Sequence, residues 1–317
     1  MNITALRRFP FQAMGSFCEI QLLDKSRIDA RQRFRLLAAE VVRLEQKFSR
    51  YRSDSLVAGI NASAGRDSGI EIDEETASLF RHASSCYEQS NGLFDITSGV
   101  LRKIWDFKSG TVPTRSQIAE LLPLVGMEKL ELRENQLFMP AGFEIDFGGI
   151  VKEYAADTAA ALARNLGIES GLINLGGDFS VIGPLPGDRP WPVGIVNPSK
   201  TENLMARLQL QRGGLASSGD YERFFMHEGK RYSHIINPMT GWPSDGLRAV
   251  SVCAELCTVA GSAATIAMLK TENDAVEWLA QLGLPHVFMR QDETIGGTAL
   301  TTDNPESRTS KQPDSSQ

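Results

Sequence analysis

The strongest constraint on this chain is a short segment in which glycines and charged residues stand immediately before a helix. Residues 144–157 read Glu-Ile-Asp-Phe-Gly-Gly-Ile-Val-Lys-Glu-Tyr-Ala-Ala-Asp. The first four residues are typical of the end of a strand, and apolar residues recur at helical spacing from Val151 to Leu162. Glycines at such a junction allow close backbone approach, and the free amides of a helix start attract a phosphate or carboxylate. The segment predicts a strand, a glycine turn and a helix, which serve either as a tight connection or as an anion site with Lys152 as a movable positive charge.

Composition and charge indicate a globular protein and argue against nucleic acid as a partner. The chain has 317 residues, 42% of them hydrophobic and 23% charged, enough for a sizeable core in one large domain or two smaller ones. Lysine and arginine number 33 against 39 aspartate and glutamate, a net charge of -6, so no broad basic surface is expected. No apolar run approaches the length of a membrane span, and we therefore expect no membrane-spanning segment.

The cysteines and the amino terminus both favour a cytoplasmic location. Cys18, Cys86, Cys253 and Cys257 are too few and too scattered for a disulfide framework, and they do not form two ligand pairs at zinc spacing. We expect all four to be reduced thiols in the core. The first residues lack the apolar core of a secretory signal, which indicates the cytoplasm.

Helical periodicity and polar tracts organise the rest of the chain. Residues 1–300 read as one folded domain, whereas residues 301–317 are too polar to bury a core and are expected to form a disordered tail. Arg27–Phe48 is predicted to be an amphipathic helix whose apolar stripe faces the core: Phe34, Leu37, Val41, Leu44 and Phe48. Asp73 is expected to cap a helix through about Ser90. Near the carboxyl end, Thr258 and Asn273 are each expected to cap a helix, the second of which ends at Gly283.

A hairpin is predicted in the carboxyl-terminal half of the chain. Ala216–Phe225 and Arg231–Ile236 flank a glycine-containing turn. Symmetrical closure places Arg223 opposite His234 and brings the polar residues 217–220 beside the loop that follows the second strand. A histidine in a strand is commonly structural, but two polar clusters paired in this way favour a functional site.

Seven short motifs follow one another along nearly the whole chain. Each is common alone, but seven in one order are specific. They are Met14-Gly-Ser16, Ser49-Arg-Tyr51 with Asp54-Ser55, Phe94-Asp-Ile-Thr97, residues 145–152 with Ala156-Asp157, Asn174-Leu-Gly-Gly-Asp178, Ser218-Gly-Asp220, and His234-Ile-Ile-Asn-Pro238 with Thr240-Gly241. In these motifs the chain resembles the ApbE family, the FAD:protein FMN transferases.

The resemblance implies an α+β fold of the ApbE type, tunnelling-fold-like, with largely antiparallel sheets flanked by helices and FAD bound in a deep cleft. It also implies transfer of the FMN half of FAD to a serine or threonine hydroxyl of an acceptor flavoprotein, with release of AMP. His234 and Asp220 are alternative bases for this reaction, and Lys152 would neutralise diphosphate charge. The positions that the resemblance assigns to the FAD site are Met14, Tyr51, Phe94, Asp95, Asp146, Gly148, Gly149, Lys152, Ser218, Gly219 and His234.

Two positions depart from the family pattern. Members carry Ala-Asp-x-x-x-Thr near the carboxyl end, where Asp and Thr bind magnesium, but this chain has Gly261 and retains only Thr265. Members also have glycine after the motif lysine, where this chain has Glu153. Either Glu153 or a nearby carboxylate such as Asp178 replaces the missing ligand, or Glu153 faces solvent and the magnesium site is impaired.

These departures leave three functions open. The first is an active FAD:protein FMN transferase. The second is an FAD-binding homologue that carries or senses flavin without catalysis, and the third is an FAD pyrophosphatase in which water replaces the acceptor hydroxyl. Gly261 is the sequence feature that separates them, and a large gain in turnover in the variant Gly261→Asp would show that the natural protein is metal-deficient.

Overall fold

An eight-stranded antiparallel sheet forms the centre of the protein. The computed structural model describes residues 5–300, and the tail predicted for residues 301–317 lies outside the described part. The sheet order is β1-β2-β6-β7-β10-β13-β14-β15, and all the strand pairs in it are antiparallel. Its strands are β1 (Ala5–Ala13), β2 (Ser16–Asp24), β6 (Gly171–Leu175), β7 (Asp178–Gly183), β10 (Gly214–Gly219), β13 (Ala249–Ala254), β14 (His286–Met289) and β15 (Ile295–Gly296).

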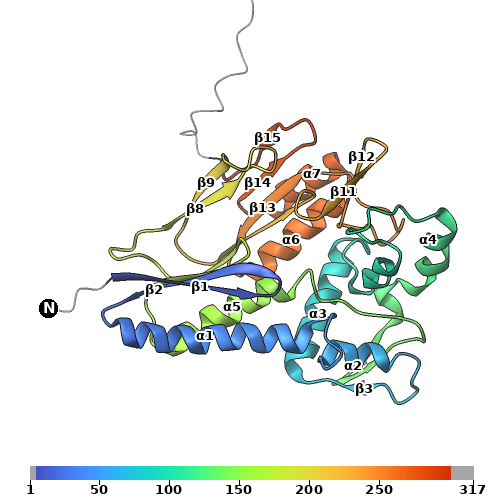
Figure 1. The fold of residues 1–317 in the computed structure, drawn as a ribbon, viewed down its shortest axis with the longest axis horizontal. Helices are drawn as coiled ribbons and strands as arrows, with labels where there is room; N and C mark the ends of the chain where they lie inside the picture. The colour runs from blue at the N-terminus through green and yellow to red at the C-terminus, as the bar shows by residue number, and fades with distance from the viewer. Residues whose placement is uncertain (1–4, 301–317) are drawn as a thin grey trace, which may run out of the picture.

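Three helices cover one face of this sheet (Figure 1). They are α1 (Arg27–Phe48), α5 (Val151–Asn165) and α6 (Cys257–Leu269); α1 packs on α5, and α5 packs on α6. The stripe predicted for α1 is confirmed, since Leu37, Val41, Leu44 and Phe48 are buried. The main core therefore lies between these helices and the sheet.

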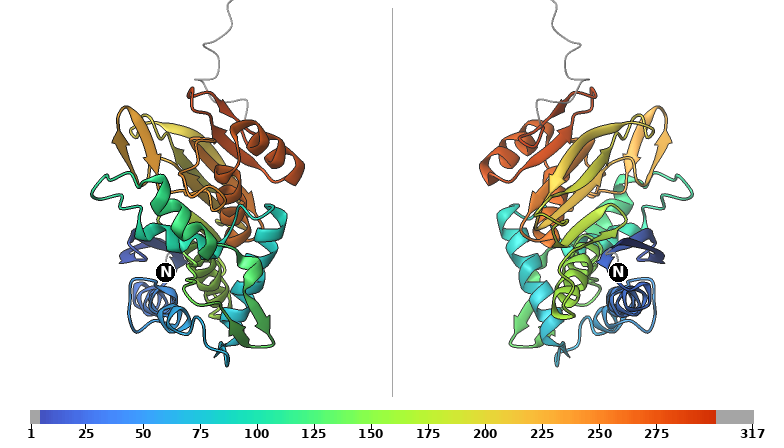
Figure 2. Two further views of the ribbon diagram at one scale, coloured as in Figure 1. Left: turned by 90° about the vertical axis from the view of Figure 1, so that its right-hand side faces the viewer. Right: turned by 90° about the vertical axis from the view of Figure 1, so that its left-hand side faces the viewer.

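A hairpin of β8 (Trp191–Val196) and β9 (Leu204–Leu210) covers the opposite face. Its alternating side chains join residues of β6, β7, β10, β13 and β14 in a second core. Figures 1 and 2 show the layering: the hairpin, the sheet and the helices. The predicted α+β class with antiparallel sheets is confirmed.

The remaining elements gather at the end of the molecule away from the amino terminus (Figure 1). Some of them build a third cluster around Trp105, whose indole nitrogen donates to the carbonyl of Gly241 at 2.8 Å. In the described residues no helix is long and apolar enough to span a membrane. The elements at this end of the molecule are α2 (Leu56–Ala62), α3 (Glu74–Gln89), α4 (Arg115–Leu121), α7 (Glu272–Leu282), the 3-10 helices η1 (Ile96–Lys103), η2 (Leu122–Leu124) and η3 (Met127–Lys129), and the strands β3 (Ile70–Glu71), β4 (Glu131–Arg133), β5 (Gln136–Phe138), β11 (Phe224–His227) and β12 (Lys230–Ser233).

The strand predicted for residues 144–147 is wrong. This segment is irregular because its backbone groups bond to side chains and to a loop rather than to a neighbouring strand. Asn61 accepts from the amide of Ile145 at 2.7 Å and donates to its carbonyl at 3.1 Å. The amide of Asp146 donates to the carbonyl of Ile96 at 2.8 Å. The apolar residues are buried, as in a strand, but a bonding side chain far away in the sequence replaces the ladder.

The predicted hairpin forms, but over a shorter span. Phe224 pairs with Ser233, so Arg223 does lie opposite His234, whereas residues 214–219 belong to β10 in the central sheet. The juxtaposition of residues 217–220 with the loop after Ile236 therefore does not follow from the register of this hairpin. The sequence predicts one run over residues 216–225, but the chain leaves the central sheet after Gly219 and enters the hairpin at Phe224.

Both cap predictions near the carboxyl end are wrong. Thr271, not Asn273, caps α7, and α6 begins after Leu256 without a side-chain cap of its own. Asp157 of α5 takes that role: its oxygens accept from the amides of Cys257 and Thr258, both at 2.9 Å, and from the Thr258 hydroxyl at 2.7 Å.

Replacement of Asp157 by alanine should lower the free energy of unfolding by about 2–3 kcal/mol, because two amides of a helix start and a hydroxyl would lose a charged acceptor. Urea denaturation measures this difference. Alanine at the exposed Asp67 is the control and should change stability by no more than about 0.5 kcal/mol. Equal effects of the two changes would contradict the capping role.

Candidate functional site

Asp146 shapes the glycine turn before α5. Its Oδ1 accepts from the amide of Gly148 at 2.9 Å, and its Oδ2 lies 3.0 Å from Arg50 Nη1 and 3.8 Å from Arg102 Nε. A Cβ added to Gly99 would lie 2.8 Å from the Cβ of Asp146, so the helix η1 approaches the turn closely. Two guanidinium groups therefore stand beside the turn, which suits an anion.

Lys152 brings three of the sequence motifs together. It extends from the first turn of α5 and forms an ion pair with the buried Asp178 at the start of β7. A Cβ added to Gly176 would lie 2.8 Å from the Cβ of Ser16 and 3.8 Å from Lys152 Cδ. The turn between β1 and β2, the turn between β6 and β7 and the start of α5 thus meet at the lysine.

Glu153 is buried between α5 and α6, with only 6% of its surface exposed. A Cβ added to Gly261 would lie 2.5 Å from Glu153 Cγ and 2.9 Å from its Oε1. Glu153 therefore occupies the space that a side chain at position 261 would need. The expectation that Glu153 faces solvent is wrong, because the absence of a side chain at Gly261 lets it turn inward.

Hydroxyl groups and a backbone amide border the same place. Ser218 Oγ lies 3.3 Å from Thr265 Oγ1, one helical turn beyond Gly261, and the amide of Ser217 donates to Asp178 Oδ1 at 3.1 Å. Within residues 5–300 no group of three or more His, Cys, Asp or Glu side chains is arranged to hold a metal ion. A cation here would need hydroxyl, water or substrate oxygens beside the carboxylates.

Burial shifts the pKa values of the ionisable groups around Lys152. Burial and the neighbouring charge of Asp178 raise the pKa of Glu153 to about 7, although Lys152 opposes the shift. Burial likewise raises the pKa of Asp178 against the effect of Lys152. Burial acts to lower the pKa of Lys152, but the charges of Asp178 and Glu153 outweigh it and raise that pKa above its usual value. One ammonium group thus faces two buried carboxyl groups.

His234 lies at the end of the β11–β12 hairpin. Its amide donates to the carbonyl of Arg223 at 2.9 Å, and its Nδ1 lies 3.2 Å from the same oxygen. Burial and the charges of Arg102 and Arg223 lower the pKa of His234 to about 4. Because Arg102 also lies beside Asp146, the histidine and the glycine turn border one region. The imidazole there is neutral at pH 7.

Asp220, the other predicted base, is engaged on both oxygens. It is buried, its Oδ1 accepts from Arg231 Nη1 at 2.9 Å, and its Oδ2 accepts from Gln291 Nε2 at 3.3 Å. These bonds tie the end of β10 to β12 and to the loop after β14. They give Asp220 a structural role, and its action as a base stays a prediction.

Asp95 and Phe94 stabilise segments next to the glycine turn, the first by hydrogen bonds and the second by packing. Asp95 Oδ1 accepts from the amide of Thr97 at 2.7 Å, and its Oδ2 accepts from the amide of Met127 at 3.1 Å. Asp95 therefore caps η1, while its contact with FAD stays a prediction. The buried ring of Phe94 would lie 3.7 Å from a Cβ on Gly149 and so packs against the glycine turn.

Three further residues that the resemblance assigns to the FAD site, Tyr51, Met14 and Gly219, differ in their exposure to solvent. Tyr51 is 77% exposed, with the Arg50 guanidinium 5.9 Å from its ring centroid. Met14 has a φ of 53° and donates its amide to Glu45 Oε1 at 2.7 Å, which fixes the turn between β1 and β2. Gly219 is buried, and a Cβ there would lie 2.2 Å from the ring of Tyr221. Contact of any of them with FAD stays a prediction.

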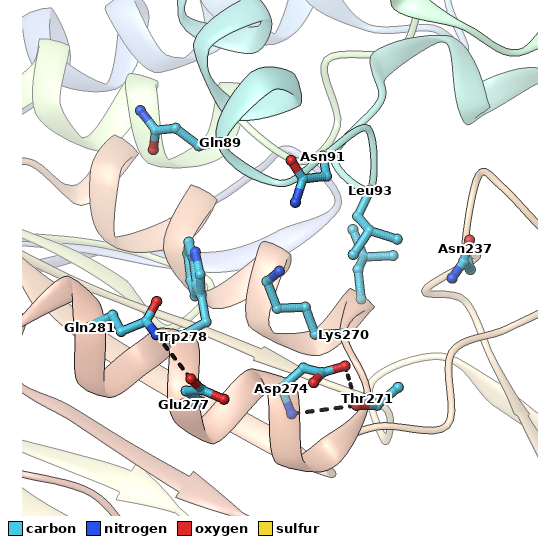
Figure 3. A pocket seen from close by; sticks show the side chains of 11 residues that line it. Gln89, Asn91, Leu93, Asn237, Lys270, Thr271, Asp274, Glu277, Trp278 and Gln281 are labelled. Atoms are coloured by element: carbon cyan, nitrogen blue, oxygen red, sulfur yellow. Dashed lines mark hydrogen bonds between the residues drawn. The ribbon is translucent and has the colours of Figure 1, made fainter.

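A groove of about 640 Å³ lies between the end of α3, α7 and the loop at Asn237 (Figure 3). Its lining is mainly polar and includes Asn91, Lys270, Asp274 and Trp278. Of the motif residues in the described chain, Asn237 alone lines it. The groove is therefore separate from the cluster around Lys152.

Sequence reasoning missed the roles of Arg50 and Arg102. Arg50 stands inside the motif at residues 49–51, so its position was marked although its contact with Asp146 was not. Arg102 follows an apolar run and carries no local signal. Its place beside Asp146 and His234 depends on tertiary packing alone.

Comparisons with known proteins agree with the motifs. A family model described as the ApbE family matches residues 14–288. The FAD:protein FMN transferase of Haemophilus influenzae is 27% identical over 281 residues, covering 84% of this chain and 81% of the relative. That of Salmonella typhimurium is 30% identical over 259 residues, covering 78% and 73%.

Solved structures agree as well. The crystal structure of the ApbE protein from Thermotoga maritima superimposes with a TM-score of 0.86 at 29% identity, covering 93% of this chain and 97% of that one. The flavin transferase ApbE from Vibrio cholerae has a TM-score of 0.84 at 22% identity, covering 94% and 98%, and this likeness concerns the fold. Because one family model spans most of the chain and relatives match over most of their own length, this protein belongs to the ApbE family.

Proposed function

We propose that this protein is an FAD:protein FMN transferase, which moves FMN from FAD to a serine or threonine hydroxyl of an acceptor flavoprotein and releases AMP. The observation that carries the proposal is that, in a chain of the ApbE family, Lys152 follows the glycine turn and Arg102 beside that turn also acts with its charge on His234. Three relatives with this activity in their names match over most of this chain.

The diphosphate of FAD is expected to lie at the start of α5. Ile150 provides no side-chain cap there. The amide of Val151 donates to the carbonyl of Phe147 at 3.0 Å, and the amides that follow it can donate to an anion. Lys152, in the first turn, adds a positive charge, and Arg50 and Arg102 stand at the preceding glycine turn. Such donors stabilise the charge that develops when the phosphoanhydride bond breaks.

In the transfer, the acceptor oxygen forms a bond to the phosphorus of FMN, the bond from that phosphorus to the AMP oxygen breaks, and the hydroxyl proton passes to a base. His234 suits the base better than Asp220 does. Its Nδ1–H can donate to the Arg223 carbonyl, which leaves Nε2 as an acceptor, and its pKa near 4 keeps it neutral at pH 7. Asp220 holds Arg231 and Gln291 instead.

Magnesium, the cation implied by the family resemblance, would neutralise charge on the diphosphate oxygens when bound. The residues that would hold it are Thr265 and a carboxylate. The unpartnered oxygen of Glu153 beside Gly261 fits this requirement in the described residues. The cytoplasmic location expected from the sequence stays a prediction.

Replacement of Lys152 by methionine should lower kcat/KM for FAD about 100-fold or more, because the diphosphate loses a charge at the reacting phosphorus. The assay supplies FAD, magnesium and a protein that accepts FMN on a threonine, and it measures AMP release and flavin fluorescence that remains on the denatured acceptor. Methionine at the exposed Lys200 is the matched control and should retain wild-type rates. Equal activity of the two variants would exclude the role of Lys152.

The same assay separates the three functions left open by the sequence. A transferase gives AMP and covalently bound flavin, and the flavin is lost when the acceptor threonine is replaced by alanine. AMP with free FMN would instead identify a pyrophosphatase. FAD binding without AMP would identify a flavin carrier or sensor.

Between about pH 6.5 and pH 4 the wild type should lose more of its free energy of unfolding than His234→Gln does. In the unfolded chain a histidine takes up a proton near pH 6.5, whereas folded His234 stays neutral down to about pH 4, so falling pH favours unfolding. Urea denaturation across this range measures the difference. The exposed His227, replaced by glutamine, should keep the wild-type pH dependence. Identical slopes for the wild type and His234→Gln would contradict a half-buried, neutral imidazole.

A further inference from the structure

Glu153 and Gly261 are complementary across the contact between α5 and α6. The glutamate points from the first turn of α5 toward α6, where the absent side chain of Gly261 leaves room for its Cγ and carboxyl group. An aspartate at position 261 would place its Cβ 2.5 Å from Glu153 Cγ. The interface therefore has space for one carboxylate, and in this chain α5 supplies it.

One oxygen of this carboxyl group is buried without a hydrogen-bond partner in the described residues. Glu153 is 94% buried, and its Oε2 makes no hydrogen bond within the described part of the chain. Lys152 is already paired with Asp178. Buried ionised groups in proteins are paired or coordinate metals, because an isolated charge in the interior is strongly unfavourable. When both carboxyl groups are ionised, the single ammonium group of Lys152 leaves one negative charge to be balanced.

Oxygen atoms lie close to Glu153 on the neighbouring elements. Thr265 lies one turn beyond Gly261 on α6, and its hydroxyl lies 3.3 Å from that of Ser218. The carboxyl group of Asp178 is buried and close enough for its charge to act on Glu153. Hard divalent cations select oxygen ligands, and magnesium commonly uses one or two carboxylates together with water and phosphate oxygens.

We propose that Glu153 is the carboxylate ligand of a divalent cation bound between α5 and α6, with the hydroxyl of Thr265 as a second protein ligand. The position beside Lys152 would let the cation meet the diphosphate of FAD. That role rests on the proposed function, whereas binding of the cation to the protein does not. Gly261→Asp alone should fail to improve the site, contrary to the expectation from sequence, because Glu153 already fills the space.

The test compares Mn²⁺ binding by electron paramagnetic resonance in the wild type, Glu153→Gln, Glu153→Gly and the double variant Glu153→Gly/Gly261→Asp. Glu153→Gln keeps the shape of the side chain and should weaken Mn²⁺ binding about tenfold or more. The double variant moves the carboxylate to α6 and should bind Mn²⁺ more tightly than Glu153→Gly. Wild-type affinity in Glu153→Gln would overturn the proposal, as would a wild type that binds no Mn²⁺. A double variant no better than Glu153→Gly would overturn this placement of the carboxylate.

Two further measurements separate folding and function from the cation site. Mg²⁺ should raise the melting temperature of the wild type but not that of Glu153→Gln. Without cation, Glu153→Gln should melt at a temperature no lower than that of the wild type. A variant that instead melts well below the wild type without cation, while the wild type shows no shift with Mg²⁺, would count against the proposal. FAD binding is measured by flavin fluorescence without any cation. If the wild type does not bind FAD, the proposed function is refuted. If it binds FAD but not Mn²⁺, only the cation site is refuted.

Discussion

The contact between α5 and α6 is the constraint on which the site depends. Glu153 and Asp157 are four residues apart and so lie on one face of α5, the face that meets α6. Asp157 receives the free amides at the start of α6 and a hydroxyl from β7 through Ser180 at 3.0 Å. It fixes where α6 begins. One turn earlier, Glu153 lies against Gly261 with an oxygen still free in the described residues. The same face therefore carries one carboxylate that builds the fold and one that is available for chemistry.

Local features were readable from the sequence because their partners are near in the chain. The apolar stripe of α1, the cap of α3 by Asp73 and the end of α7 at Gly283 each involve residues within a few positions of one another. The pairing of Arg223 with His234 follows from a short turn for the same reason. Where the partner is remote, the prediction failed. Asp157 caps a helix that begins 100 residues later, and Asn61 bonds to a segment 84 residues away. No periodicity or spacing encodes such bonds.

The motifs identify the family more securely than they identify the role of each residue. Several of their polar side chains have both oxygens occupied by the protein itself, as Asp95 and Asp220 do. Asn237 likewise accepts from the amides of Met239 and Thr240 and holds its own loop. Such residues position the segments around the cluster at Lys152. The groups left to meet a ligand are fewer: the glycine turn, Lys152, His234, Glu153 and the hydroxyls beside it. Sequence alone does not divide the two sets, because both consist of the same residue types.

The ion pair of Lys152 with Asp178 links the proposed binding of the FAD diphosphate to the proposed binding of the cation. A diphosphate at the start of α5 would compete with Asp178 for the ammonium group, since both are anions within reach of one flexible side chain. When Lys152 turns toward the phosphate, Asp178 and Glu153 lose the positive charge that they share. Two buried carboxylates would then stand without a counter-charge, which is strongly unfavourable in the interior. A divalent cation beside Glu153 would relieve this cost and would also neutralise the diphosphate. Binding of diphosphate and of cation should therefore favour each other by the same free energy, whichever binds first.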